Sequence, residues 1–214
     1  YLSMKPHEGG KYQYTLTILN ALSDISLNKY ELIAFYHDNS WESKLANHIV
    51  GKKLRGRNIF QRIIRKFLFN SSLLLWRYLG KYLDPVQKDF YVNNLDLVFF
   101  PGNDSLSFEM KLSTACPIFD LMHLYEKRFS EISSLAIIKL RNKHYNRVCK
   151  YSNLILVDSK VGRDHVMESF SVINNKIFIL PYIAPPYVRH KIKNINLNKK
   201  HNIFKKYIFY PAQF

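Results

Sequence analysis

Short apolar runs recur along the chain with the lengths that suit the strands of a sheet. The run in "LDLVFFP" (95–101) is continuous and stops at Pro101-Gly102, as expected for a strand buried on both faces. "YELIAFYH" (30–37) has the aromatic and aliphatic composition of a strand, and "YLSM" (1–4) has the pattern of a strand end. Comparable apolar runs occupy 116–122, 153–159 and 176–182.

Segments with the period of a helix separate these runs. A Gly9-Gly10 turn opens the first, in which apolar side chains recur every four residues. Residues 59–69 are strongly amphipathic. Further helices are expected at 41–50, 131–151 and 160–170, the last capped by Ser159. Buried strands that alternate with helices predict an α/β fold with a Rossmann-like parallel sheet flanked by helices.

The composition divides the chain into three parts. Residues 1–188 are expected to form one N-terminal Rossmann-like domain, and the apolar share of 47% is sufficient for its packed core. Residues 189–206 are rich in Lys, Asn and His and are expected to form a solvated basic linker. Residues 207–214, "YIFYPAQF", are expected to form the first strand of a second, C-terminal domain.

The formal net charge of +16 comes from two acid-free segments. Residues 52–83 carry nine Lys or Arg, residues 189–206 carry seven, and the rest of the chain is balanced. Nucleic-acid-binding proteins more often have a basic face that spreads over the whole fold. The charge distribution therefore argues against nucleic acid as the partner.

Cysteine and histidine usage narrows the chemistry. Cys116 and Cys149 have no metal-ligand spacing, so we expect inert, reduced thiols in a cytoplasmic protein. His144 and His165 also lack such spacing, and no metal site is expected. No uninterrupted apolar run of the sequence reaches the roughly 18 residues that a membrane span needs.

The basic segment 52–83 permits three interpretations: a nucleic-acid site, a solvated helix face, or a foot on a membrane. Its aromatic residues lie among aliphatic ones rather than on a basic sheet face, which disfavours base stacking. Arg62, Arg65 and Lys66 suit a solvated face, yet ordinary soluble surfaces mix both signs of charge. Basic amphipathic helices lie on anionic lipid with Trp, Phe and Leu at the boundary, and Trp76, Phe67 and Phe69 are available here. We therefore expect Arg62, Arg65 and Lys66 to face an anionic membrane, with the protein peripheral on its inner, cytoplasmic side.

Ligands of open parallel sheets bind beyond the carboxyl ends of the strands. That rule marks Gly9-Gly10, the segment 101–104, His123 and the pair Ser159-Lys160. Two glycines before a helix suit either a tight turn or a phosphate contact, but they complete neither a G-x-G-x-x-G nor a Walker motif.

Two polar residues of "FDLMH" are candidates for the same edge. His123, expected at the end of a strand, could hydrogen-bond a sugar hydroxyl or a phosphate oxygen, or it could be structural. Asp120 could orient the adjacent loop or be buried and paired.

Several segments taken together resemble the N-terminal half of family-4 glycosyltransferases, which have the GT-B fold. They are "GGKYQYTLTILNAL", "CPIFDLMHLYEKRFSEISSLAIIKLRNKHYNRVCKYSNLILVDSKVGRDHVMESF", "KIFILPYIAPP" and "YIFYPAQF". The likeness spans most of the chain and is weakest from 38 to 92. It implies two Rossmann-like domains that face each other across a cleft, the N-terminal one on the acceptor side.

The resemblance also implies an activity and its residues. Such enzymes transfer a sugar from a nucleotide-sugar to a glycan or lipid-linked acceptor with retention, and they need no metal or other cofactor. Gly9 and Gly10 match the glycine turn near the donor diphosphate, and His123 matches the catalytic cleft histidine that contacts the donor sugar. Ser159 and Lys160 match the start of the helix after a cleft strand. The donor-binding glutamates of the family belong to its C-terminal domain, outside this chain.

An alternative from a different class remains open. The chain could be a stand-alone α/β module that binds phosphorylated or nucleic-acid ligands. The apolar segment 207–214 behind a charged linker favours the two-domain enzyme, because a complete single domain should not end on an orphan strand.

Overall fold

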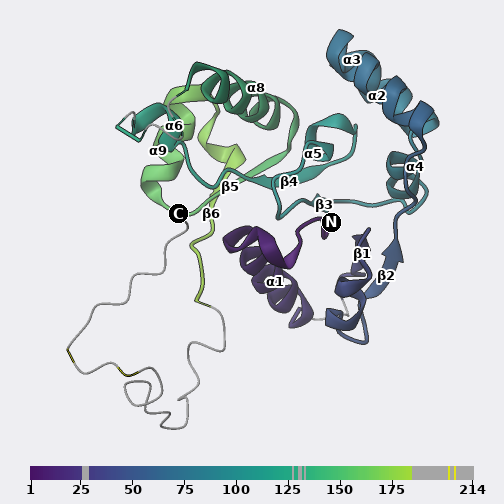
Figure 1. The fold of residues 1–214 in the computed structure, drawn as a ribbon. Helices are drawn as coiled ribbons and strands as arrows, with labels where there is room; N and C mark the ends of the chain where they lie inside the picture. Colours follow the sequence, from purple (N-terminus) through teal and green to yellow (C-terminus); the bar gives the residue numbers. More distant parts are fainter. Residues whose placement is uncertain are drawn as a thin grey trace. The chain divides into compact units, whose positions relative to one another are not determined.

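A computed structural model describes residues 1–25, 29–126, 128–129, 132, 134–184, 202 and 205. The chain divides into two compact units, Tyr1–Ile183 and Ala184–Phe214. The first unit contains the α/β domain (Figure 1). The expected linker at 189–206 and strand at 207–214 lie outside the described residues, apart from two isolated positions of the linker.

The core of the domain is a parallel sheet. Four strands pair in the order β3-β4-β5-β6, and a second parallel pair joins β1 to β2. The strands are β1 (Ile33–Tyr36), β2 (Val50–Lys53), β3 (Val98–Phe99), β4 (Thr114–Pro117), β5 (Leu154–Val157) and β6 (Ile177–Ile179).

The N-terminal segment connects the two groups of strands. Leu2 forms a parallel bridge with Tyr36, and its backbone N–H donates to the Phe35 carbonyl at 2.8 Å. The Tyr1 backbone nitrogen donates to the Phe99 carbonyl, on β3, at 2.6 Å. If this segment is counted as strand 1, the order across the domain begins 3-2-1-4-5-6, which is the doubly wound Rossmann-like arrangement. The expected fold class is confirmed at that level.

Helices cover both faces of this sheet, and polar side chains define where many of them begin. Asn58, Ser72, Asp84, Ser134 and Ser159 each accept a hydrogen bond from a backbone N–H in the first turn of the following helix. The α-helices are α1 (Gly10–Ser23), α2 (Ile59–Ser71), α3 (Leu73–Leu83), α4 (Pro85–Tyr91), α5 (Leu106–Glu109), α6 (Met122–Tyr125), α8 (Leu135–Tyr151) and α9 (Lys160–Phe170), and the 3-10 turns are η1 (Pro6–Glu8), η2 (Asn39–Lys44) and η3 (Asn174–Lys176).

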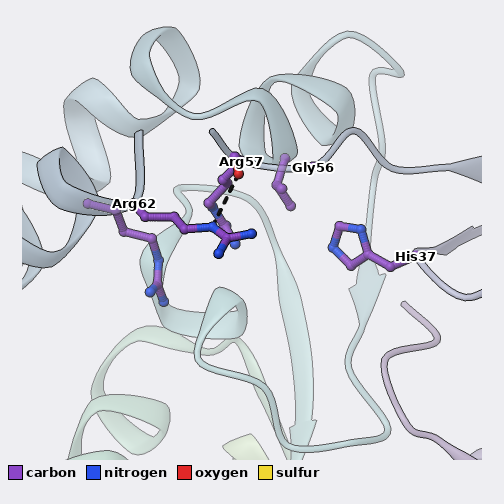
Figure 2. A pocket seen from close by; sticks show the side chains of 6 residues that line it. His37, Gly56, Arg57 and Arg62 are labelled. Atoms are coloured by element: carbon purple, nitrogen blue, oxygen red, sulfur yellow. Dashed lines mark hydrogen bonds between the residues drawn. The ribbon is translucent and has the colours of Figure 1, made fainter. Parts of the chain in front are cut away.

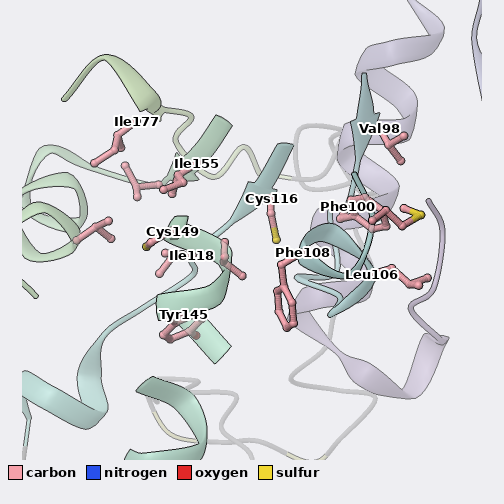
Figure 3. Packing of buried hydrophobic residues seen from close by; sticks show 14 of the residues in the cluster. Val98, Phe100, Leu106, Phe108, Cys116, Ile118, Tyr145, Cys149, Ile155 and Ile177 are labelled. Atoms are coloured by element: carbon pink, nitrogen blue, oxygen red, sulfur yellow. The ribbon is translucent and has the colours of Figure 1, made fainter. Parts of the chain in front are cut away.

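The alternation of side chains along β1 separates two hydrophobic clusters. Ala34 and Tyr36 pack with Tyr12, Leu19 and other residues under α1. Phe35 points to the opposite face and joins a larger cluster, to which α4, α5, α8 and α9 contribute (Figure 3). In Figure 1, α1 and α8 accordingly lie on opposite sides of the strands. A side-chain period of two is what a strand covered on both faces requires.

Two expectations about local structure were wrong. The expected strand at 116–122 ends at Pro117, and the following residues form a loop and the short helix α6. The expected helix at 41–50 is instead the turn η2 followed by a loop, and Val50 already belongs to β2. The sequence of β2, "VGKK", has little apolar character because it lies at the edge of the sheet with mostly exposed side chains.

A buried carboxylate anchors the two helices of the basic segment 52–83. Glu109, with a fully buried side chain, accepts hydrogen bonds from Arg65 Nε at 3.0 Å, Trp76 Nε1 at 2.8 Å and Ser105 Oγ at 2.6 Å. Arg65 Nη2 also pairs with the same carboxylate. These contacts tie α2 and α3 to α5. Arg65 was expected to face a membrane with Arg62 and Lys66, but its charge is directed inward.

Two arginines one turn apart on α2 should therefore differ in their contribution to stability. Arg65→Ala should lower the free energy of unfolding by about 3 kcal/mol, because it leaves the buried Glu109 carboxylate without its cation. Arg62 Nε donates to the Arg57 carbonyl oxygen at 3.2 Å, and no carboxylate among the described residues pairs with it, so Arg62→Ala should lower this free energy by about 0.5 kcal/mol or less. Urea denaturation followed by circular dichroism measures both, and equal losses would contradict the anchoring role of Arg65.

Candidate functional site

The strand order reverses between the N-terminal segment and β3, and the loops after these two strands meet there. Ser3 Oγ donates to Asp104 Oδ2 at 2.6 Å. A Cβ added to Gly102 would lie 2.5 Å from Met4 Cε and 2.8 Å from Ser3 Oγ, so any larger residue would force these side chains to move. A reversal of strand order is where doubly wound sheets bind ligands.

The Gly9-Gly10 turn lies at the same reversal, directly before α1. Gly9 has φ +57° and acts as the N-cap of α1, a backbone conformation that glycine adopts without strain. A Cβ added to either glycine would meet no atom within 4 Å among the described residues. The first N–H groups of a helix have no partner within the helix. The turn therefore offers backbone donors to an anion in an open space.

Aromatic contacts bring three segments of the carboxyl edge together. The Tyr14 ring of α1 packs edge-on against Phe119 and Tyr182, with centroid distances of 5.4 and 5.6 Å. Tyr182 donates its hydroxyl hydrogen to the Phe119 carbonyl at 3.2 Å, and Lys11 Nζ lies 5.9 Å from the Phe119 ring. The helix after the glycine turn, the loop after β4 and the segment after β6 therefore share one edge.

Asp120 orients this loop, one of the two roles that its sequence position allowed. Its carboxylate accepts from Arg141 Nη2 at 3.1 and 3.2 Å and from the Met122 backbone N–H at 3.1 Å. The first contact fixes the loop to α8, and the second initiates α6. Asp120 thus connects the edge to the helix that carries His123.

His123 does not end a strand, because the strand stops at Pro117 and His123 lies within α6. Its side chain is only 1% exposed and packs 5.8 Å from the Tyr145 ring. His123 Nε2 lies 2.8 Å from Asn142 Oδ1, so Nε2 carries the hydrogen, while Nδ1 is buried without a hydrogen-bond partner among the described residues. Burial lowers the pKa of His123, which keeps the ring neutral.

Ser159 and Lys160 follow the carboxyl end of β5. Ser159 Oγ accepts from the Gly162 N–H at 3.0 Å and donates to Asp158 Oδ1 at 3.1 Å. The expected capping role of Ser159 is confirmed. Lys160 begins α9 with an exposed side chain.

A pocket of about 430 Å³, which sequence reasoning missed, lies at the end of the carboxyl edge formed by β1 and β2. His37 directly follows β1, and Gly56 and Arg57 follow β2 (Figure 2). Arg62, Arg65 and Val86 complete its lining. The polar residues that follow two neighbouring strands could have indicated this pocket if "VGKK" had been recognised as a strand.

Three arginines give the pocket lining positive charge, and carboxylates neutralise two of them. Arg57 makes two 2.8 Å hydrogen bonds to Asp84, and Arg65 pairs with Glu109. Among the described residues no carboxylate pairs with Arg62, whose side chain reaches the Arg57 carbonyl (Figure 2). Burial and the nearby Arg57 lower the pKa of His37. An anion would meet one uncompensated guanidinium there.

His144 holds the loop at the strand-order reversal. Its Nε2 lies 2.9 Å from Asn103 Oδ1, and the Cys116 thiol donates to the same oxygen at 3.3 Å. Asn103 has φ +60°, a conformation in which Asn is enriched. The sequence had marked His144 only as an unsuitable metal ligand, and its contact across the fold was not predictable from spacing.

Neither thiol is activated. Cys116 and Cys149 are buried and free, and burial raises the pKa of both, that of Cys149 to about 12. The described part of the chain contains no group of three or more His, Cys, Asp or Glu side chains that could hold a metal ion. Nucleophilic chemistry by a cysteine thiolate is therefore not supported.

Acidification should weaken the fold through His144. Burial, together with Lys11 and Arg147, lowers its pKa from 6.5 to about 4, whereas the Asn103 hydrogen bond raises it. Between these values the unfolded chain binds a proton that the folded protein does not, so stability falls as the pH decreases from about 6.5 to 4. Between pH 7 and pH 5, the melting temperature of His144→Gln should decrease less than that of the wild type, as measured by calorimetry. Identical losses would exclude this role.

In comparisons with models of known protein families and with curated proteins, the chain matches none of them. The functional assignment thus depends on the motifs of the sequence and on the geometry of the carboxyl edge. What the structure establishes by itself is an α/β domain with a parallel sheet flanked by helices, whose strand-order reversal carries an open glycine turn.

Proposed function

We propose that this chain is the acceptor-side, N-terminal domain of a GT-B glycosyltransferase. The reaction transfers a sugar from a nucleotide-sugar to a glycan or lipid-linked acceptor, with retention of anomeric configuration and without a bound metal. One observation carries the proposal: the Gly9-Gly10 turn, which the family resemblance places near the donor diphosphate, opens α1 at the reversal of strand order. The space above both Cα atoms is open among the described residues.

Each edge residue has a defined part in this proposal. The backbone N–H groups at the start of α1 face the diphosphate, whose negative charge the N-terminus of a helix favours. Lys160, exposed beyond β5, adds positive charge at the cleft. Asp120 and Ser159 position their loops through the contacts to Arg141 and Gly162. The donor's nucleotide is held by the second domain in the family that the sequence resembles.

His123 needs a different role from the one that the resemblance implies. A side chain that is 1% exposed does not touch a sugar in this conformation. Its bond to Asn142 fastens α6 to α8, directly after the Asp120 loop. We therefore assign His123 as a positioning residue for the edge, and its neutral Nδ1 can accept a hydrogen bond from a sugar hydroxyl only if α6 moves.

Substitution of Gly10 separates a ligand-binding role from a structural one. Gly10→Ala adds a methyl group at a helical position with open space, so the free energy of unfolding should stay equal or increase slightly. In the enzyme that contains this chain, that methyl group should obstruct the diphosphate and lower kcat/KM at least about tenfold, or about 1.4 kcal/mol.

Asn20→Ala, an exposed substitution in the same helix, provides the matched control. It improves helix propensity without approaching the turn, so turnover of a labelled nucleotide-sugar should remain at the wild-type level. If Gly10→Ala also retains full activity, the turn is only a tight turn and the diphosphate contact is refuted.

The alternative of a stand-alone module for phosphorylated ligands is favoured by Arg62, which lines the pocket and has no carboxylate partner within the described part of the chain. Calorimetric titration of this chain with nucleotide-sugars and with inorganic phosphate distinguishes the two proposals. As half of a cleft, the chain should bind nucleotide-sugars with a Kd above about 1 mM, which corresponds to only about −4 kcal/mol. Micromolar binding to the chain alone would favour the module, and loss of that binding in Arg62→Ala would locate it.

A further inference from the structure

The amphipathic helices α2 and α3 direct apolar side chains into solvent. On α2, Ile59, Ile63 and Phe67 follow one another at intervals of four residues, so they share one face of the helix. Leu74, Tyr78 and Tyr82 have the same spacing on α3. All six are between 60% and 71% exposed, and the neighbouring Phe60 is 73% exposed. We refer to these seven residues as the α2–α3 apolar face.

Polar contacts on the inner side of both helices fix this orientation. Arg65 of α2 and Trp76 of α3 bond to the buried Glu109. Arg77 donates to the Phe108 carbonyl and lies 4.4 Å from the Tyr151 ring. The usual arrangement, with charges outward and apolar residues inward, is therefore partly inverted here. Rotating either helix to bury its apolar face would break these bonds, so the exposure follows from the packing.

The accessible charge around this face is positive. Arg62 and Lys66 are exposed on α2. Lys111 Nζ lies 3.0 Å from the centroid of the Tyr78 ring, and Lys81 Nζ lies 4.9 Å from that of Tyr82.

Negative charge is absent from the same stretch of sequence. It contains no Asp or Glu from 43 to 83. The two carboxylates that these helices contact, Asp84 and Glu109, are 2% and 0% exposed and already paired with arginines. A partner would therefore meet apolar groups flanked by the cations of Arg62, Lys66, Lys81 and Lys111.

We propose that the α2–α3 apolar face docks on the surface of an anionic lipid bilayer. Apolar side chains would enter the boundary between headgroups and acyl chains, where tyrosine is also favoured, and the flanking cations would contact the headgroups. A second copy of the chain is a poorer partner, because a twofold interface would bring like charges together. This surface differs from the expected one, since Arg65 is directed inward and Trp76 is buried, whereas Phe67 belongs to both.

The proposal goes beyond the proposed transferase activity and does not depend on it. The structure contains no helix, among the residues it describes, that is long and apolar enough to cross a bilayer. Contact through α2 and α3 would be peripheral. Because Arg62 belongs both to this region and to the arginine pocket, a bound bilayer would lie next to that pocket.

Co-sedimentation with vesicles tests the proposal directly. The chain should pellet with vesicles of phosphatidylcholine and phosphatidylglycerol and stay in the supernatant with phosphatidylcholine alone. About 0.5 M salt should release much of the bound protein, since the screening length then falls to roughly 4 Å. A wild-type chain that ignores anionic vesicles at low salt overturns the proposal.

Two double variants have matched controls on another helix. Ile63→Ser with Phe67→Ser should reduce the partition coefficient about tenfold or more, and Arg62→Glu with Lys66→Glu about thirtyfold or more. Leu135→Ser with Leu140→Ser removes comparably exposed apolar side chains from α8, and Lys139→Glu with Lys143→Glu makes the same change of net charge with the same spacing. Both controls should bind nearly as well as the wild type.

The comparison between the two helices decides the outcome. If the α8 variants lose vesicle binding as strongly as the α2 variants, binding depends on overall composition and charge, and the α2–α3 apolar face is not the docking surface. If sedimentation velocity shows a dimer that Ile63→Ser with Phe67→Ser dissociates, the face binds a second copy and the lipid proposal is overturned. All substituted side chains are exposed, and circular dichroism with a thermal melt verifies that each variant is folded.

Discussion

The buried carboxylate of Glu109 determines how the helices α2 and α3 are oriented on the domain. A fully buried carboxylate is stable only when donors surround it, and Arg65 of α2, Trp76 of α3 and Ser105, the N-cap of α5, supply them. Through these bonds α2 and α3 acquire a fixed orientation relative to α5, which belongs to the core. The exposure of their apolar residues and the position of Arg62 in the pocket both follow from this one arrangement.

The sheet imposes a second constraint, which acts on the opposite end of the carboxyl edge. Because the chain winds in two directions from its N-terminal strand, the loops after that strand and after β3 diverge from neighbouring positions. His144 and the Cys116 thiol hold Asn103 in one of these loops, and Gly9 shapes the other. The geometry of the loop after β3 therefore depends on side chains from α8 and β4 that are distant in sequence.

Together these constraints place different chemistry along one edge. The glycine turn offers backbone donors and open space, whereas the arginine pocket offers a side-chain cation close to an apolar helical face. In the proposed transferase the donor diphosphate would bind at the first, and the second lies next to the proposed bilayer contact. The proposed transferase and the proposed bilayer contact are consistent with each other, although each is carried by separate residues.

The sequence by itself determined the fold class, because continuous apolar runs and four-residue periodicity arise from local burial. It predicted β5 and β6, the cap at Ser159 and the glycine turn, since each depends on nearby residues. It misjudged β2, whose edge position removes the apolar pattern, and the end of β4, where the Asp120 contacts compete with strand pairing. Only the tertiary structure decided that His123 is buried and that Arg65 faces Glu109, because their partners lie 19 and 44 residues away and periodicity does not reveal which face of a helix meets a carboxylate.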